Sequence, residues 1–200
     1  MPIVFDKKAG QYRGEDGKFV PRITIENLIT NEIVRNQRRS QALTTKLIEG
    51  DLDLDVWQQS IMQTIKESHL RLGILGSGGI NNMDASKYGA IGNQIKEQYQ
   101  YLAKFARSIE DSELSEAQIR MRLDQYMQSS KVTFYKLELK TRLNDGFQRG
   151  KRLLDRQSKH CPACITHERL DWVSLSEIVA PGTSCQCRSN CRCKLKYSRF

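Results

Sequence analysis

The sequence predicts a mainly α-helical protein: a body of about five helices, an extended N-terminal arm, and a small C-terminal zinc-binding module with short β-strands. Three observations predict this fold class. Apolar residues recur at intervals of three and four along most of residues 25–154, the period of a helix that is buried on one face. The first 22 residues are polar and interrupted by glycines. All six cysteines lie within residues 161–193. We therefore predict an arm over 1–22, a helical domain over 23–155 and a Cys-rich module over 156–200.

The N-terminal segment reads as a turn between two short extended pieces. Two glycines are expected to form the turn within residues 12–20, which read Tyr-Arg-Gly-Glu-Asp-Gly-Lys-Phe-Val. Ordering such a segment costs about 1–2 kcal/mol per residue in backbone entropy. We therefore expect an arm that lies on a neighbouring molecule rather than a part of the core.

The first helix is predicted to run from Ile25 to a stop at Gly50. A second helix is predicted to begin after the acidic stretch 51–55. The middle of the first, residues 35–40, is polar on every side and is expected to face solvent or a partner. The aspartates of 51–55 suit a helix N-terminus, and they lack the Gly and Glu that a calcium loop needs at its sixth and twelfth positions. In the second helix one face carries Trp57, Ile61, Ile65 and Leu72, with the tryptophan as a core anchor.

Residues 73–79 are rich in glycine and are predicted to form a flexible corner between helices. A phosphate-binding loop would need a preceding strand and a Gly-Lys-Ser/Thr ending, and neither is present. A third helix is predicted over residues 86–109. Its buried stripe comprises Tyr88, Ile91, Ile95, Tyr99, Leu102, Phe105 and Ile109.

Ser115 and Gln118 form a capping box that starts a fourth helix, which is predicted to end near Ser130. A fifth helix is predicted over residues 131–154, although Gly146 and Gly150 weaken its far end by about 1 kcal/mol each. In the module that follows, residues 172–175 and 193–197 are expected to form two short strands on either side of a turn at Pro181 and Gly182.

The six cysteines follow the spacing of metal ligands. The first group is Cys161-Pro-Ala-Cys164, and after 20 residues the second group reads Cys185-Gln-Cys187-Arg-Ser-Asn-Cys191-Arg-Cys193. Zinc takes four thiolates in a tetrahedron, supplied by two short-spaced groups that the intervening chain brings together. We therefore predict a structural Zn²⁺ site whose candidate ligands are Cys161, Cys164, Cys185, Cys187, Cys191 and Cys193.

The sequence leaves the ligand set open. Cys161 and Cys164 are the firmest pair, and either Cys187 with Cys191 or Cys191 with Cys193 can complete the site. Six sulfurs are too many for one zinc ion and few for two, unless a sulfur bridges or a histidine helps. His160 and His167 are therefore reserve ligands, and the alternative for each is a solvated imidazole.

Disulfides are the main alternative to a metal site, and free thiols are a second. The chain opens MPIVFDKKAG, without the apolar core of a secretory signal, so an oxidising compartment is not indicated. A disulfide within a Cys-x-Cys pair would also close no loop of useful length. A thiol nucleophile at Cys161 would need a base and an orienting group, and no third group is evident.

The charge of the chain is concentrated in the Cys-rich module. The net charge is +9, and residues 151–200 hold ten basic and four acidic side chains. This module can therefore contact phosphate or an acidic protein, or it can present a solvated face.

No apolar run is long enough to span a membrane, so we expect no membrane contact. No catalytic constellation emerges, and zinc held by four sulfurs has no open position for water, so we expect no enzyme activity.

The C-terminal module resembles that of tailed-bacteriophage head-morphogenesis (minor head) proteins. The matching residues are Cys161, Cys164, Trp172, Pro181, Gly182, Asn190, Cys191, Arg192 and Cys193. Many relatives end in His-Pro-Asn-Cys-Arg-Cys, whereas Arg188 and Ser189 stand here in place of the histidine and proline. The resemblance covers about a fifth of the chain, and residues 12–20 also look like the arm of small phage virion proteins.

The resemblance implies a non-enzymatic virion structural protein that is assembled in the host cytoplasm. It implies contacts with phage coat, portal or neck proteins, in a homo- or hetero-oligomer, and contact of the basic module with packaged DNA. A nucleic-acid-binding zinc protein that acts in the host cell is the alternative, and a nuclease is a third hypothesis, although grouped acidic metal ligands are missing.

Overall fold

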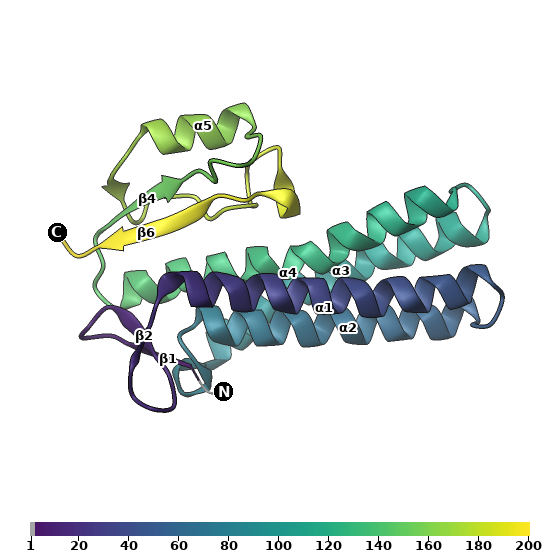
Figure 1. Cartoon of the computed structure of the whole chain (residues 1–200), viewed down its shortest axis with the longest axis horizontal. Helices are drawn as coiled ribbons and strands as arrows, with labels where there is room; N and C mark the ends of the chain where they lie inside the picture. Colours follow the sequence, from purple (N-terminus) through teal and green to yellow (C-terminus); the bar gives the residue numbers. More distant parts are fainter. Residues whose placement is uncertain (1–2) are drawn as a thin grey trace. The chain divides into compact units, whose positions relative to one another are not determined.

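The computed structural model describes residues 3–200, and within them it is mainly α-helical, as predicted (Figure 1). The helices are α1 (Arg22–Ile48), α2 (Leu54–Gly76), α3 (Ala85–Glu110), α4 (Glu116–Asn144) and α5 (Pro162–Arg169). The strands are β1 (Val4–Asp6), β2 (Gln11–Arg13), β3 (Phe19–Val20), β4 (Arg149–Leu153), β5 (Val173–Ser174) and β6 (Lys194–Ser198). Short 3₁₀-helices cover Ile80–Asn82 and Arg188–Asn190. In this described part, no helix combines the length and the apolar character that a bilayer span requires.

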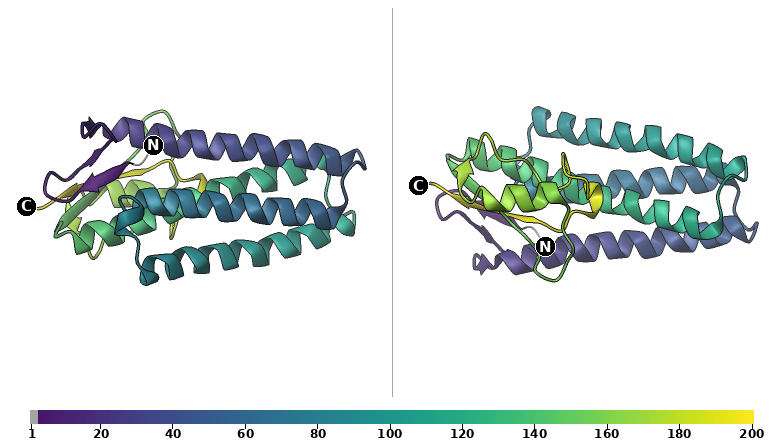
Figure 2. Two further views of the ribbon diagram at one scale, coloured as in Figure 1. Left: turned by 90° about the horizontal axis from the view of Figure 1, so that it is seen from below. Right: turned by 90° about the horizontal axis from the view of Figure 1, so that it is seen from above.

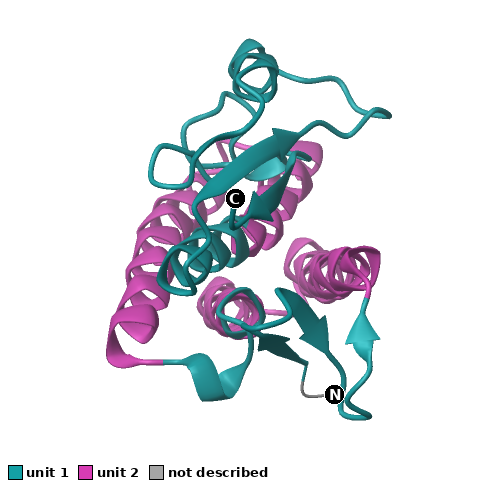
Figure 3. Cartoon of the chain, turned by 90° about the vertical axis from the view of Figure 1, so that its left-hand side faces the viewer, with its two compact units in different colours: residues 1–20, 74–83, 132–200 teal, residues 21–73, 84–131 magenta. Residues whose placement is uncertain are grey.

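The chain divides into two compact units that interleave along the sequence (Figure 3). Unit 1 comprises residues 1–20, 74–83 and 132–200, and unit 2 comprises residues 21–73 and 84–131. The ranges predicted from the sequence, 1–22, 23–155 and 156–200, are contiguous, and residues 1 and 2 of the first range lie outside the described residues. Helices α2 and α4 begin in unit 2 and end in unit 1.

Unit 2 is a bundle in which α1, α3 and the adjoining parts of α2 and α4 run side by side (Figure 2). Its core comprises Trp57, Ile61, Ile65, Leu102, Phe105, Ala106, Ile119, Leu123 and Met127. Trp57 is fully buried, as predicted, and its indole Nε1 donates to Thr44 Oγ1 at 3.0 Å. Burial of aromatic and branched side chains along 3.6-residue periods accounts for the first three predicted helices.

Two details of unit 2 differ from the sequence prediction. Tyr88 belongs to the predicted stripe of α3 but is 44% exposed, because it lies in the first turn of the helix. The polar middle of α1 is not wholly solvent-facing, since Asn36 and Ser40 are buried. Ser40 reaches the Met127 sulfur at 3.2 Å, so a small hydroxyl occupies a helix contact where an apolar residue is usual.

The predicted break between a fourth and a fifth helix near Ser130 is wrong, because α4 runs without interruption to Asn144. Ser130 lies inside the helix, where its hydroxyl donates to the backbone carbonyl of Met127. The hydroxyl therefore has a hydrogen-bond partner without ending the helix. The predicted capping box is present, with the Gln118 Oε1 accepting from the Ser115 backbone N–H at 2.8 Å. Beyond Asn144, Gly146 at φ +82° ends the helix, and residues 149–153 form β4 rather than the predicted helix.

The N-terminal segment of unit 1 folds into an antiparallel sheet in the order β1-β2-β3. Phe5 and Tyr12 pair across β1 and β2, and both side chains are buried. The prediction of an arm that stays outside the core is therefore wrong. The two rings meet edge to face at 5.1 Å between centroids, which gives the segment an apolar anchor within unit 1.

Unit 1 also contains a buried ionic cluster around Arg142. The Arg142 guanidinium stacks on Phe5 and donates to Tyr12 Oη at 3.1 Å, and its side chain is 2% exposed. The carboxylates of Glu138 and Asp145 lie 3.7 Å from its terminal nitrogens and are equally buried. Tyr197 of β6 donates to Glu138 at 3.0 Å, so the cluster joins α4 to both sheets of the unit.

The C-terminal part of unit 1 is a second antiparallel sheet, in the order β5-β4-β6, with α5 beside β4 and β6 (Figure 1). The two strands predicted over residues 172–175 and 193–197 are present as β5 and β6. Both pair with β4, which lies between them. The register Leu153↔Lys194 places the chain just after β4 next to Cys193, just before β6. This pairing brings the two ends of the Cys-rich segment together.

Replacing Gly76 with alanine is expected to destabilise unit 1 by about 1–3 kcal/mol, because the added methyl group would overpack a helix contact. The new Cβ would lie 2.4 Å from the backbone oxygen of Phe134, which cannot move aside alone. The matched control is Gly92→Ala in α3, where no atom lies within 4 Å. There the change should stabilise the bundle by about 0.5–1 kcal/mol. Urea unfolding of both variants tests the pair, and equal effects would contradict the Gly76 contact.

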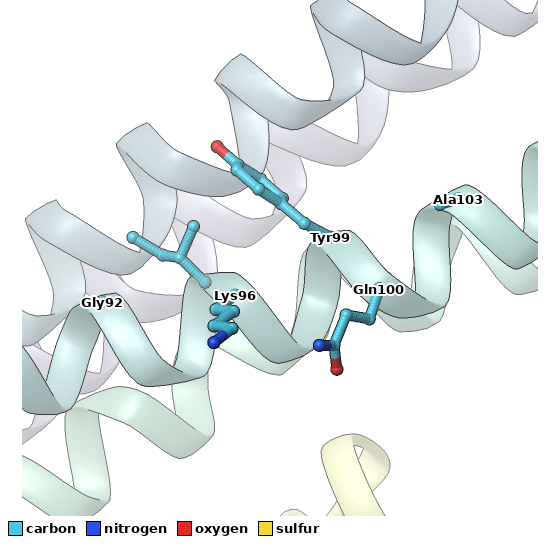
Figure 4. Close-up of a pocket in the computed structure, with 6 residues that line it drawn as sticks. Gly92, Lys96, Tyr99, Gln100 and Ala103 are labelled. Carbon is cyan, nitrogen blue, oxygen red and sulfur yellow. The ribbon is translucent and has the colours of Figure 1, made fainter.

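Gly92 also lines a hollow along α3 (Figure 4). Its lining comes from this one helix and consists of Gly92, Ile95, Lys96, Tyr99, Gln100 and Ala103. A site for a small molecule usually gathers polar groups from several elements. The lining of this hollow comes from a single helix, so we do not take it as a candidate binding site.

Candidate metal centre

Helix α5 positions the first two cysteines. Cys161 is its N-cap residue, and Pro162 follows at the first helical position, where its fixed φ suits the start of a helix. Cys164 lies one turn further and is fully buried, and its backbone N–H donates to the Cys161 carbonyl at 3.0 Å. A single helical turn thus directs two thiols to one side.

The second group of cysteines comes from the irregular segment that leads into β6. Cys185 and Cys187 precede the 3₁₀-helix Arg188–Asn190, and Cys191 and Cys193 follow it. The turn before this segment depends on Gly182, which has φ +86°. A Cβ on Gly182 would lie 2.7 Å from the Val132 side chain, so only glycine fits. The predicted Pro181–Gly182 turn therefore has a steric reason.

The structure brings all six cysteines together as free thiols, in two groups that share one sulfur. The members are Cys161, Cys164, Cys185 and Cys187 in the first group, and Cys164, Cys191 and Cys193 in the second. Within each group the sulfurs lie within 4.8 Å of one another. Clustered cysteines of this kind can hold a metal ion.

The separations between sulfurs match those of a metal-thiolate centre. Cys164 Sγ lies 3.9 Å from Cys187 Sγ and 3.7 Å from Cys191 Sγ. In a tetrahedron with metal–sulfur bonds of 2.3 Å, two sulfurs are about 3.8 Å apart. A disulfide would instead place the two sulfurs about 2.05 Å apart. The geometry therefore favours a metal ion over disulfides within this cluster.

The thiols differ in acidity because they hydrogen bond to one another. Burial raises the pKa of Cys164, and hydrogen bonding to the neighbouring Cys191 thiol raises that of Cys193. Hydrogen bonding from Cys193 lowers the pKa of Cys191 to about 4. For Cys161, burial acts upward, but hydrogen bonds from the Cys164 and Cys187 backbones and from the Cys187 thiol lower the pKa to about 6. Sulfurs this close can all ionise only around a cation.

The two reserve histidines differ in how close they lie to the sulfurs. The Nδ1 atom of His160 lies 3.9 Å from Cys193 Sγ, and its Nε2 atom is 2.6 Å from the backbone oxygen of Asp155. His167 lies on α5 and is half-buried, and burial followed by the Arg152 guanidinium lowers the pKa of its imidazole. His160 is thus the histidine whose ring nitrogen is placed against a thiol of the cluster.

Arg152 is one of the basic residues near the cysteines in the sequence, but its contact with a sulfur was not predicted. It lies on β4, is 1% exposed, and donates through Nη1 to Cys164 Sγ at 3.8 Å and through Nη2 to the Val179 carbonyl. The inward positions of β4 are Gly150 and Arg152, so the strand lacks the apolar alternation that would have predicted it. A buried guanidinium beside a thiolate offsets negative charge that would be costly to bury alone.

The other basic side chains of the module face outward to different degrees. Arg188 and Arg192, which follow Cys187 and Cys191, are exposed, as is Lys196. Lys151 pairs with Asp171 at 3.0 Å. The positive charge seen in the sequence is therefore divided between one buried cation at the cysteines and several exposed ones.

Comparisons of this chain with protein-family models, with curated proteins and with solved structures found no match in any of the three.

Proposed function

We propose that the six cysteines bind zinc as a structural centre, and that the protein is an architectural component without enzymatic activity. The observation that carries this proposal is the convergence of six free thiols in two groups, with Cys164 at 3.9 Å and 3.7 Å from Cys187 and Cys191, close to the edge of a zinc–thiolate tetrahedron. Protein sulfurs then fill the coordination positions, which leaves no place for a reactive water molecule. The module would act as a clasp that holds the β4–β6 end of unit 1 in shape.

The assembly in which the clasp serves is proposed to be the head of a tailed bacteriophage. The support is the resemblance of residues 161–193 to the terminal module of minor head proteins, including the turn at Gly182 and the run 190–193. In that setting the protein would contact coat, portal or neck proteins in the virion.

Metal analysis of the purified protein tests the zinc centre. The wild-type chain is expected to carry zinc and no iron, and Cys161→Ser is expected to lower the zinc content. Ser184→Ala, an exposed neighbour of Cys185, is the matched control and should keep the full content. Protein isolated without bound metal, or with iron and visible absorption of a cluster, would contradict the zinc proposal.

Mass spectrometry of purified particles tests the virion role. The chain should be detected in particles released from a host that carries the gene, and crosslinks should join it to coat, portal or neck proteins. Its absence from particles that are otherwise complete would overturn the virion role and leave the zinc centre untouched.

The alternative, a nucleic-acid-binding zinc protein, is favoured by the exposed Arg188 and Arg192 beside the cysteines. It predicts binding to DNA or RNA with a logarithmic affinity that falls linearly with the logarithm of the salt concentration. The double variant Arg188→Gln with Arg192→Gln should then bind more weakly and with a shallower salt slope. A filter assay without retention of nucleic acid at 50 mM salt would remove this alternative.

A further inference from the structure

We propose that the centre is binuclear: two zinc ions share the Cys164 thiolate, and His160 is the seventh protein ligand. This inference rests on the proposed zinc binding and adds its stoichiometry, its bridge and a nitrogen ligand.

The grouping of the sulfurs points to two tetrahedra. The first group holds four cysteines, which is the full ligand set of one zinc ion. The second group reuses Cys164 and adds Cys191 and Cys193, so it supplies three ligands and lacks a fourth. A single ion would leave two of these cysteines outside its coordination sphere.

Cys164 is placed to bond both ions. Its sulfur lies 3.9 Å from a sulfur of the first group, that of Cys187, and 3.7 Å from a sulfur of the second, that of Cys191. Both distances are close to the edge of about 3.8 Å in a zinc–thiolate tetrahedron. A thiolate has several lone pairs and can donate to two metals at once, as terminal thiolates donate to one. The sulfur is fully buried, and Arg152 is the cation beside it.

His160 supplies the missing ligand. Its Nε2 atom lies 2.6 Å from the carbonyl oxygen of Asp155, and because a carbonyl only accepts, Nε2 must carry the proton. In the neutral ring, Nδ1 then holds a lone pair, and it lies 3.9 Å from Cys193 Sγ. A metal-ligating histidine typically donates its other N–H to a carbonyl or carboxylate in this way. Sulfur and nitrogen on one zinc ion are about 3.6 Å apart. His160 is not a member of the three-sulfur group, so its ring must move toward Cys164 and Cys191 when the second ion binds.

The loop that carries this carbonyl is itself held in place. The Asp155 carboxylate accepts from the Ser158 hydroxyl at 2.7 Å and from the Gln157 backbone at 3.1 Å. The turn therefore fixes the carbonyl that orients the imidazole. Seven protein ligands with one bridge fill eight positions, the number that two tetrahedral ions require. Six thiolates and two Zn²⁺ ions leave a charge of about −2, which the buried Arg152 partly offsets.

Native mass spectrometry with zinc as the only added metal tests the stoichiometry and the histidine together. The wild-type chain should bind two zinc ions. His160→Ala should keep one and release the second at least about tenfold more readily to a chelator, as expected when a contact that holds a metal is lost. His167→Ala on α5 is the matched control and should behave as wild type. Wild-type protein that binds a single ion overturns the binuclear proposal but leaves a zinc centre, whereas protein that binds none removes both.

A competing arrangement would use Cys185 as a second bridge, because its thiol also hydrogen bonds to Cys191. In that case every zinc ligand is sulfur and His160→Ala changes nothing, which would overturn the assignment of the histidine.

Zinc X-ray absorption of the wild-type protein distinguishes the two arrangements without a variant. We expect about 3.5 sulfur and 0.5 nitrogen ligands per ion, against about four sulfurs for two bridges. In ¹¹³Cd-loaded protein, two resonances with a mutual coupling would report the shared sulfur, and two uncoupled resonances would contradict it.

Discussion

Removal of zinc is expected to unfold the Cys-rich end of unit 1 while the bundle of unit 2 stays folded. The buried cluster of this end consists of Cys164, Cys185, Cys191 and Cys193, with few apolar side chains packed against it. Binding of structural zinc is worth about 10–16 kcal/mol in small zinc modules, as much as the whole stability of a typical domain. The core of unit 2 contains no cysteine and should not respond to the metal.

The two tryptophans report on this difference, since Trp57 lies in unit 2 and Trp172 in unit 1. With 5-fluorotryptophan in the wild-type chain, ¹⁹F spectra during titration with a strong chelator should shift the Trp172 resonance and leave that of Trp57. Trp172→Phe assigns the two signals. Added zinc should restore the original spectrum. Simultaneous loss of both signals, or no change in either, would contradict a metal-dependent clasp confined to unit 1.

Replacement of Arg142 with methionine is expected to destabilise unit 1 by about 3–5 kcal/mol, because it removes the cation beside the buried Glu138 carboxylate and leaves Asp145 with Lys7 alone. Glu138 and Asp145 both lie 3.7 Å from the guanidinium, and the Glu138 side chain is fully buried, whereas Asp145 also pairs with the exposed Lys7 at 3.2 Å. The loss should appear in urea unfolding followed by the Trp172 signal. Lys18→Met removes the exposed partner of Asp16 in the same unit and is the control, with an expected change within about 1 kcal/mol.

A double variant separates lost charge from lost packing at this position. If the cost arises from the unpaired carboxylate, adding Glu138→Gln to Arg142→Met should recover part of the stability, because the neutral amide needs no cation. If the cost arises from the lost stacking on Phe5, the second change should bring no recovery. A single Arg142→Met variant as stable as wild type would show that the cluster contributes little.

The elements that the sequence predicted well are those with a repeated apolar period. The stripe from Ile91 to Phe105 marks α3, and the capping box at Ser115 marks the start of α4. The cysteine spacing likewise pointed to one cluster, because two groups on a short loop can meet only in a few ways. These features depend on neighbours in the sequence, and local patterns reveal them.

The features that were missed depend on contacts between distant segments. β4 turns a glycine and Arg152 inward, so no alternation of apolar residues marks it as a strand. Ser130 resembles a helix stop but is buried on an uninterrupted helix. The role of Arg142 requires the Phe5 ring, which is 137 residues earlier in the chain. A charged residue is expected at the surface, and only the folded arrangement shows that Arg142 is enclosed.

Because Gly150 pairs with Tyr197, the β4–β6 pair cannot form until the end of the chain has been synthesised. β4 leaves the ribosome more than forty residues before β6, and its neighbour β5 covers only two of its residues. Until β6 is synthesised, one edge of β4 is unpaired. During the same time the thiols of Cys161 and Cys164 lack the cysteines of the second group. The nascent segment is then at its greatest risk of oxidation or aggregation. Rapid capture of the metal once Cys193 emerges would end this vulnerable period.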